Sequence, residues 1–120
     1  MNVYEEEARD RWAGTDAYRQ SISKTSRYSA EDFAAAKVDQ EAATELFVSA
    51  FGNGHSIDSP KAQEAVIAHR AAITKWFYDC SVEMQKNLAT IYIEDPRFAE
   101  YYDGRVRGLS HYVHDAIMAQ

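Results

Sequence analysis

Residues that interrupt helices are scarce in this chain, and this scarcity most limits what it can fold into. Among 120 residues there are only five glycines and two prolines. Few stretches show the period-two alternation of β-branched residues that is typical of strands. The length is about that of one domain. We therefore expect a single all-α domain in which most residues between the breakers are helical.

Start and stop signals place the expected helices. Ser59-Pro60 and Asp95-Pro96 each combine an N-cap residue with a proline suited to the first helical turn. Ser29 with an acidic residue three positions later resembles a capping box. The clearest loop is GNGHS at 52–56, and a glycine at 104 ends a short helix. The expected helices cover about 3–12, 16–25, 33–51, 60–77, 79 or 81 to 93, 96–102 and 107 onward.

Apolar residues recur at helical spacing within these segments and predict the faces that form the core. On the longest segment the expected stripe is interrupted at Gln40 and consists of Phe33, Ala36, Ala43, Leu46, Phe47, Ala50 and Phe51. On the next segment it consists of Ala62, Val66, His69, Ile73 and Trp76. On 79–93 it consists of Met84, Leu88 and Ile91, and on the last of Leu109, Tyr112, Val113, Ala116 and Ile117.

Charge and cysteine content exclude several classes of protein. The formal net charge is −6, which disfavours nucleic-acid binding because phosphate recognition needs concentrated cationic charge. Cys80 is the single cysteine, so an intrachain disulfide cannot form. The apolar stretches are far shorter than the roughly 20 residues of a membrane span, and the first residues lack signal-peptide features. We therefore expect a cytoplasmic protein without membrane contact.

The placement of the aromatic residues is unusual. Trp76, Phe77 and Tyr78 are consecutive, and successive helical residues point about 100° apart, so one stripe cannot bury all three rings. Tyr101 and Tyr102 pose the same problem. Two interpretations follow: the rings form the core and rim of a small helical protein, or they line a cleft for a flat or apolar ligand.

Candidate chemical groups are few. His69 lies on an apolar stripe, where it is either a hydrogen-bonded core residue or a polar group facing a ligand. Cys80 and Asn87 are seven residues apart and are expected to share one helix face. His111 and His114 have too few companions for a metal site. None of the common nucleotide, hydrolase or metalloprotease motifs occurs, so we expect no metal, no cofactor and no enzymatic activity.

Two motifs near the start resemble a known family. The run YEEEARDRW at 4–12, followed by GTDAYRQS at 14–21, is similar to the opening of the TipAS antibiotic-recognition domain. This domain is the effector half of thiostrepton-induced and related MerR-type transcriptional regulators. The similarity continues, in order, through Tyr28, His69-Arg70, Tyr78-Asp79-Cys80, Glu83-Met84, Leu88, Tyr92, Asp95, Arg97-Phe98, Gly108-Leu109, Tyr112 and Ala116-Ile117.

The resemblance implies a globin-like bundle of about six to seven helices with a cleft for thiopeptide-like or other bulky antibiotics. It also implies that the helices within 1–27 act as a mobile lid over a core at 29–120. Isolated helices this short are marginal in water, so a ligand could order them. The expected ligand-binding residues are Trp12, Tyr18, Tyr28, His69, Trp76, Tyr78, Asp79, Cys80, Met84, Asn87, Tyr92 and Tyr112.

The chain departs from the family in two ways. Asn87 stands where the thiostrepton-induced regulator has a cysteine that attacks its ligand, so we expect reversible binding unless Cys80 substitutes. No MerR-type DNA-binding segment is found, so we expect either the sensor part of a longer, homodimeric regulator or a stand-alone drug-sequestering protein. An alternative is a protein or peptide interaction domain without a small-molecule ligand. A third is haem binding through His69.

Overall fold

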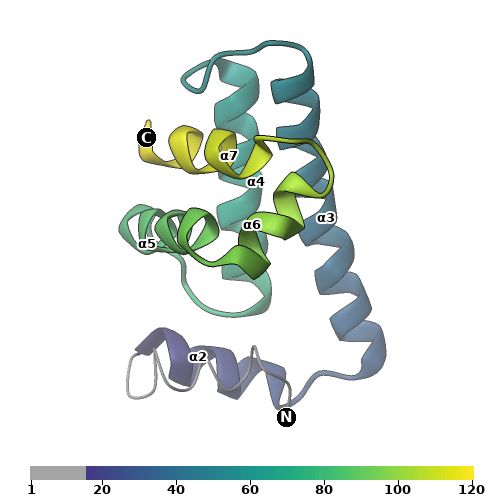
Figure 1. Ribbon diagram of the computed structural model, residues 1–120. Coiled ribbons are helices and arrows are strands. Elements are labelled where there is room, and N and C mark those ends of the chain that lie inside the picture. Colours follow the sequence, from purple (N-terminus) through teal and green to yellow (C-terminus); the bar gives the residue numbers. More distant parts are fainter. Residues whose placement is uncertain (1–15) are drawn as a thin grey trace.

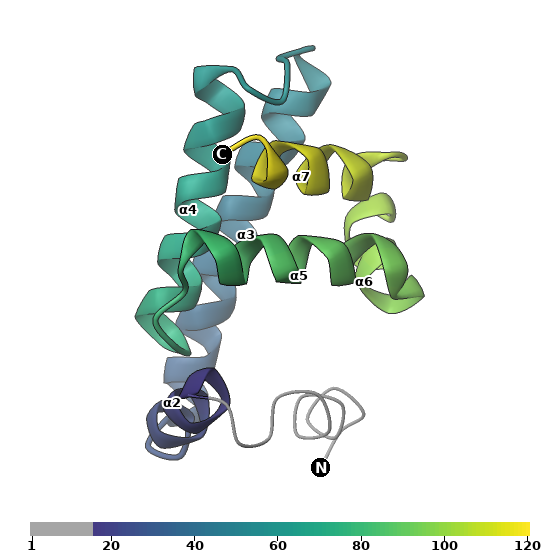
Figure 2. The ribbon, with the colours of Figure 1, turned by 90° about the vertical axis from the view of Figure 1, so that its left-hand side faces the viewer.

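Most of the molecule consists of two pairs of helices, and one pair lies across the other. The computed structural model describes residues 16–120. α3 (Ala30–Gly52) and α4 (Pro60–Trp76) lie antiparallel, and α5 (Val82–Glu94) and α7 (Leu109–Met118) lie across them (Figures 1 and 2). α6 (Pro96–Asp103) joins the crossing pair, and α2 (Asp16–Thr25) lies near the N-terminal end of α3 (Figure 1). The described residues contain helices and no strand, as the sequence predicted.

Local capping interactions explain where the helices begin. Ser29 and Asp32 form a complete capping box, because each side chain accepts a hydrogen bond from the backbone N–H of the other. The Oγ of Ser59 accepts from the Ala62 N–H at 3.2 Å, and Pro60 is the first residue of α4. The predicted starts at Pro60 and Pro96 are therefore confirmed. The helix expected at 3–12 lies outside the described residues.

α7 begins at a glycine that the geometry requires. Gly108 has a φ of 88°, a left-handed conformation that side-chain-bearing residues rarely adopt. A Cβ at this position would make only an ordinary contact with the ring of Phe51, at 3.7 Å, so the positive φ and not crowding requires the glycine. The carboxylate of Asp103 then accepts hydrogen bonds from the backbone N–H and the hydroxyl of Ser110, at 2.9 and 3.0 Å. The turn therefore fixes α7 against α6.

The core lies where the two helix pairs cross. Phe47, Leu109 and Ile117 are fully buried there, together with small residues that let the helices approach closely. Two residues of the predicted α3 stripe are outside this core: Phe33 is 48% exposed and Leu46 is 37% exposed. α3 is long, and its first turns extend past α5 and α7 (Figure 1). Phe33 therefore lies where neither of these helices covers it. The prediction that Phe33 and Leu46 belong to the core-facing stripe was wrong.

Candidate functional site

A cavity of about 580 Å³ lies among α3, α4, α5 and α6. Its volume is within the range of about 300–1,000 Å³ that is common for small-molecule sites. The described residues that line it are mostly aromatic and aliphatic: Ser21, Ala36, Gln40, Ala43, His69, Ala72, Ile73, Phe77, Tyr78, Leu88, Ile91, Tyr92, Arg97, Phe98, Tyr101 and Tyr102. The aromatic-lined cleft that the sequence left open as one interpretation is therefore present.

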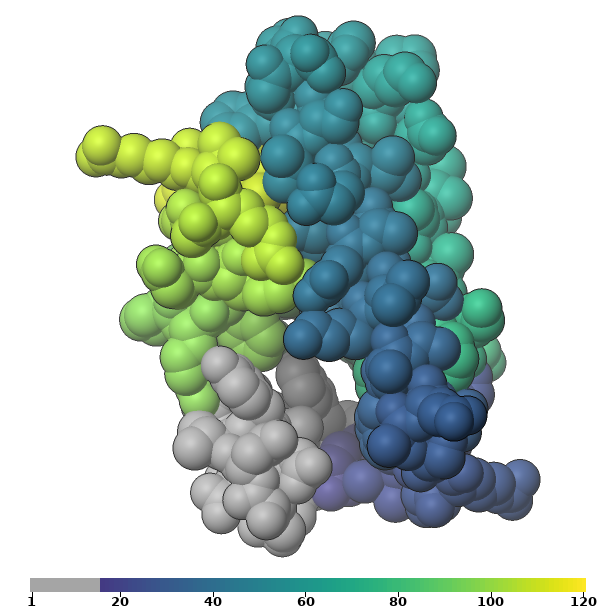
Figure 3. Space-filling view, turned by 90° about the vertical axis from the view of Figure 1, so that its right-hand side faces the viewer, coloured from purple at the N-terminus to yellow at the C-terminus, as the bar shows by residue number. Residues whose placement is uncertain are grey.

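A second hollow of about 620 Å³ continues the cavity along α3. The two share Ala36, Gln40, Phe77 and Tyr101 in their walls, so they form one cleft. Figure 3 shows the surface hollowed between α3 and α6, on the side that faces α2. A ligand larger than the inner cavity can thus extend outward along α3.

His69 forms part of the inner wall and is held from both sides. Its Nδ1 lies 2.8 Å from the Gln85 amide nitrogen, and its Nε2 lies 3.0 Å from the Tyr92 hydroxyl. Burial lowers the pKa of His69 to about 4, so the imidazole is neutral at pH 7. The interpretation of His69 as a hydrogen-bonded core residue is therefore confirmed. Its side chain also lines the cavity, and its contact with a ligand stays a prediction.

The three consecutive rings separate onto two surfaces. Phe77 and Tyr78 line the cavity, whereas Trp76 turns outward and donates from its Nε1 to the carboxylate of Asp39 at 2.7 Å. This hydrogen bond, together with Lys75 at 3.3 Å, holds the pKa of Asp39 below its usual range. The prediction that one stripe cannot bury all three rings is confirmed. The helical spacing given as its reason does not apply, because α4 ends at Trp76 and Phe77 and Tyr78 lie beyond it.

Several predicted site residues lie on α2, just after it, or near the end of α4, and do not line the cavity. The Tyr28 hydroxyl donates to the Trp76 carbonyl, and the two rings meet edge to face. The backbone N–H of Asp79 donates to the Gln20 side chain at 2.9 Å. Tyr18 is half-buried on α2. Of α2, only Ser21 is among the described residues that line the cavity.

The expected shared face of Cys80 and Asn87 was wrong. α5 begins at Val82 with Ser81 as its N-cap, so Cys80 precedes the helix, while Asn87 is exposed on it. The same boundary places Asp79 outside the helix. Burial raises the pKa of the Cys80 thiol to about 11, and the opposing effect of Arg70 is smaller. The thiol is therefore protonated at pH 7 and a poor nucleophile.

Two further predicted residues pack elsewhere. Met84 is half-buried against the core, and Tyr112 stacks on Phe51 with its hydroxyl donating to the His55 carbonyl at 2.9 Å. Trp12 lies outside the described residues. Of the twelve predicted residues, His69, Tyr78 and Tyr92 line the cavity. The contacts that any of the twelve makes with a ligand stay predictions.

Cavity residues that sequence reasoning missed come chiefly from α6 and the inner face of α3. They include Phe77, Phe98, Tyr101 and Tyr102, together with the small residues Ala36, Ala43 and Ala72. The available signals were the run Trp76-Phe77-Tyr78 and the pair Tyr101-Tyr102, because consecutive rings cannot all face the core. Small residues leave room for a ligand, but the sequence around them does not indicate that they line a cavity.

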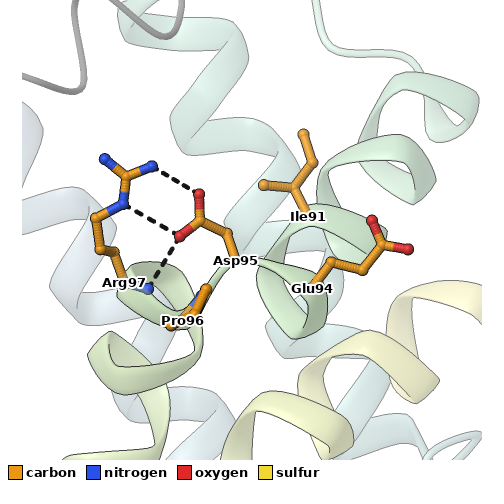
Figure 4. Close-up of a pocket in the computed structure, with 5 residues that line it drawn as sticks. All are labelled: Ile91, Glu94, Asp95, Pro96 and Arg97. Carbon is orange, nitrogen blue, oxygen red and sulfur yellow. Dashed lines mark hydrogen bonds and ion pairs between the residues drawn. The ribbon is translucent and has the colours of Figure 1, made fainter.

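The turn between α5 and α6 forms a smaller hollow of about 380 Å³ (Figure 4). Asp95 caps α6 and is buried, and the Arg97 guanidinium donates to both of its carboxylate oxygens, at 3.2 and 2.8 Å. Arg97 also lines the main cavity. The ion pair therefore holds one edge of the cleft in place.

Metal and haem ligation find little support among these residues. In residues 16–120 there is no cluster of three or more histidine, cysteine, aspartate or glutamate side chains suited to a metal. Both ring nitrogens of His69 are in hydrogen bonds with buried partners. The residues at this wall therefore do not fit an axial haem ligand.

A family model described as the TipAS antibiotic-recognition domain matches residues 4–120. The chain belongs to the TipAS family. The curated HTH-type transcriptional activator TipA of Streptomyces coelicolor is 41% identical to this TipAS domain over 116 residues, which are 97% of this chain and 46% of the relative. The activator mta of Bacillus subtilis is 27% identical over 118 residues, 98% of this chain and 45% of the relative.

The TipAS assignment also agrees with a solved structure. A chain of Streptomyces lividans TipAS, described as nosiheptide in complex with TipAS within a thiopeptide antibiotic multidrug resistance system, superposes with a TM-score of 0.87. It is 41% identical, and the match covers 97% of this chain and 81% of that one. The predicted family and all-α fold are therefore confirmed.

This domain spans about half the length of the curated relatives. No helix of the described part is long and apolar enough to cross a membrane.

Proposed function

We propose that this TipAS domain binds thiopeptide-like or other bulky multi-ring antibiotics, reversibly, in the cleft between α3 and α6. The supporting observation is the ring-lined cavity of about 580 Å³ with its outward continuation. The related structure carries a thiopeptide, nosiheptide, and shares the fold. Binding buries apolar rings of the ligand against side chains such as Phe77 and Phe98, and this burial supplies most of the affinity.

Reversible binding is supported by the residues at positions 87 and 80, where a reactive cysteine would be needed for covalent capture. Asn87 carries an amide without nucleophilic character. The Cys80 thiol is buried and its pKa is raised to about 11, so little thiolate forms at pH 7. No side chain at either position is activated for covalent capture. The domain acts by binding, without an enzymatic step.

The N-terminal helices serve as a lid over the bound ligand in this proposal. α2 buries no residue, and it reaches the body through polar contacts such as Lys24 to the Thr74 carbonyl at 2.9 Å. Trp12, outside the described residues, is a further candidate lid residue. Trp12→Ala should weaken ligand binding while α3–α7 stay folded, as measured by tryptophan fluorescence titration together with circular dichroism.

The domain serves either as the sensor of a MerR-type regulator or as a drug-sequestering protein. The relatives TipA and mta are named as transcriptional activators, which supports the sensor role and a cytoplasmic location. The acidic balance of the sequence suits a domain that does not itself contact DNA. In the sensor role, the full-length regulator is a homodimer whose contacts lie mainly outside this domain.

Two neighbouring alanines of α4 provide a matched test. Ala72 lines the cavity, whereas Ala71 is exposed beside it. Ala72→Trp should fill the cavity and remove the rise in melting temperature that nosiheptide causes, and Ala71→Trp should keep it. A ligand at 100 times its Kd adds about 2.7 kcal/mol of stability, which a thermal shift assay resolves readily.

Two results of this test would contradict the proposal. If nosiheptide and a panel of other multi-ring antibiotics do not stabilise the wild-type domain, small-molecule binding fails and the peptide-interaction alternative gains support. If nosiheptide stabilises both tryptophan variants equally, the ligand binds outside the cavity.

A further inference from the structure

The inner cavity and the outer hollow of the cleft meet at a junction formed by α3, α6 and the end of α4. The described residues that line both hollows are Ala36, Gln40, Phe77 and Tyr101. Ala36 and Gln40 lie about one turn apart on α3, Tyr101 lies on α6, and Phe77 directly follows α4. A ligand that occupies both hollows must pass these four residues. They therefore decide which chemical groups the middle of such a ligand can carry.

Gln40 is the residue at which the apolar stripe of α3 is interrupted. Its neighbours on this face of the helix are Ala36, four residues earlier, and Ala43, three residues later. Both alanines are buried and line the inner cavity. Gln40 lines the same cavity but is exposed. The polar residue therefore interrupts the stripe at the point where α3 borders the open cleft.

Of the four residues at the junction, only Gln40 has side-chain hydrogen-bond donors that are not already used. Ala36 and Phe77 carry no such donor. The Thr44 hydroxyl donates its single proton to the Gln40 carbonyl at 3.1 Å. The Tyr101 hydroxyl, 3.1 Å from that of Thr44, must therefore donate its own proton to Thr44. The Gln40 side-chain amide makes no hydrogen bond within residues 16–120.

An amide side chain is suited to the peptide groups of a ligand. Its nitrogen can donate two hydrogen bonds to carbonyl oxygens or azole nitrogens, and its oxygen can accept from an amide N–H. Exposure lets water satisfy the Gln40 amide in the free protein. A ligand that fills the junction displaces this water and must replace its hydrogen bonds, or the amide is left unpaired at a cost. Apolar walls do not discriminate in this way.

We propose that Gln40 is a specificity-determining residue whose side-chain amide hydrogen-bonds an amide or azole group of a ligand that spans both hollows. This inference rests on the proposed antibiotic binding and deepens it. The apolar rings of the cavity supply affinity for any multi-ring compound of suitable size. Gln40 favours, among these compounds, those that carry a peptide-type group where the two hollows meet, as a thiopeptide can.

Nosiheptide titrations of three proteins test the role of Gln40. Gln40→Met keeps the length of the side chain and removes its hydrogen-bonding groups, and should weaken binding about tenfold by isothermal titration calorimetry. The matched control Glu45→Met places the same residue at an exposed position of α3 that lines neither hollow. It should change the Kd less than about threefold. Both positions are exposed, so both variants should fold, as circular dichroism checks.

The outcomes separate the inference from the proposed function. Equal affinity of Gln40→Met and wild type, or equal losses in Gln40→Met and Glu45→Met, would overturn the inference while the proposed function stands. If nosiheptide binds none of the three proteins, the proposed function fails and the inference fails with it.

A spectroscopic measurement tests the hydrogen bond itself. The side-chain amide signals of Gln40 can be assigned in nitrogen-15 spectra by their loss in Gln40→Met. Nosiheptide should shift these signals and slow the exchange of the amide protons with water, because the protons become hydrogen-bonded to the ligand. Unchanged exchange at Gln40, in a complex whose Ala43 methyl signal shifts, would overturn the inference, since the ligand would then occupy the cavity without using this amide.

Discussion

α2 and the body formed by α3–α7 are held in different ways. The body surrounds a core in which Phe47, Val66 and Leu109 are inaccessible to solvent, and helices distant in sequence share it. α2 buries no residue, and Ile22, its large aliphatic side chain, is 50% exposed. The comparison indicates that the body and the walls of the cavity are stable without a ligand. α2, which lies at the entrance of the cavity, gains little stability from its contacts with the body.

The largest difference between the two regions is expected in the free energy of unfolding, when one apolar side chain is truncated in each region. Phe47→Ala removes a fully buried ring and should lower the free energy of unfolding by about 3–5 kcal/mol. Ile22→Ala, on the surface of α2, should change it by less than about 0.5 kcal/mol. Urea denaturation followed by circular dichroism measures both. Similar losses in the two variants would show that α2 belongs to the cooperative core.

Acid should weaken the body through His69. Unfolded histidine titrates near pH 6.5, whereas burial lowers the pKa of His69 to about 4, so the unfolded state binds this proton more readily. Stability from this group is complete above about pH 6.5 and is lost as the pH falls to about 4, by about 3 kcal/mol. Urea denaturation across this range measures the loss.

Two histidine variants isolate that effect. His69→Gln should flatten the dependence of stability on pH between 6.5 and 4. His111→Gln, at an exposed position of α7, should preserve it. An unchanged slope in His69→Gln would show that carboxylates, and not this buried imidazole, produce the acid sensitivity.

Hydrogen exchange should separate the regions within one sample. Amides of α2 in the free protein should open with a free energy at least about 2 kcal/mol lower than those of α4, because α2 has no buried residue whereas α4 has four. Nosiheptide should slow exchange in α2 and leave the order of the two helices unchanged. Equal protection of α2 and α4 without ligand would contradict the lid.

The smallest effect is expected from one polar contact of α2. Gln20→Ala removes the acceptor of the Asp79 N–H and should cost about 1 kcal/mol or less. The loss should appear as faster exchange in α2 with little change in global unfolding. Gln63→Ala would be the contrasting variant, because Gln63 donates to the Ala116 carbonyl within the body, and its effect should appear in global stability.

The sequence predicted the helices well because their limits are set locally. Ser59-Pro60 and the Ser29–Asp32 capping box need only neighbours a few residues away, and both were recognised. The wall of the cavity depends instead on how helices cross. Trp76 was expected at the site but binds Asp39 of α3, while Phe77 next to it faces the cavity. Nothing local to either residue distinguishes these outcomes.

The burial and the contacts of the polar residues also depend on how the helices pack, which the sequence does not show. Gln85 looks like an ordinary helical residue in the sequence, yet it is fully buried and fixes His69. Cys80 and Asn87 have the spacing of a shared helix face, but the helix starts between them. The consecutive aromatic residues and the family resemblance both led to the expectation of a cleft, and the structure shows which residues form its walls.

The most direct test of the account is where nosiheptide lies on this domain. Intermolecular nuclear Overhauser effects should connect its protons to the methyl groups of Ala43 and Ala72, which line the cavity. The exposed methyl groups of Ala34 and Ala71, on the same two helices, should show none. Contacts to Ala34 and Ala71 without contacts to the cavity methyl groups would contradict the claim that this cleft is the binding site.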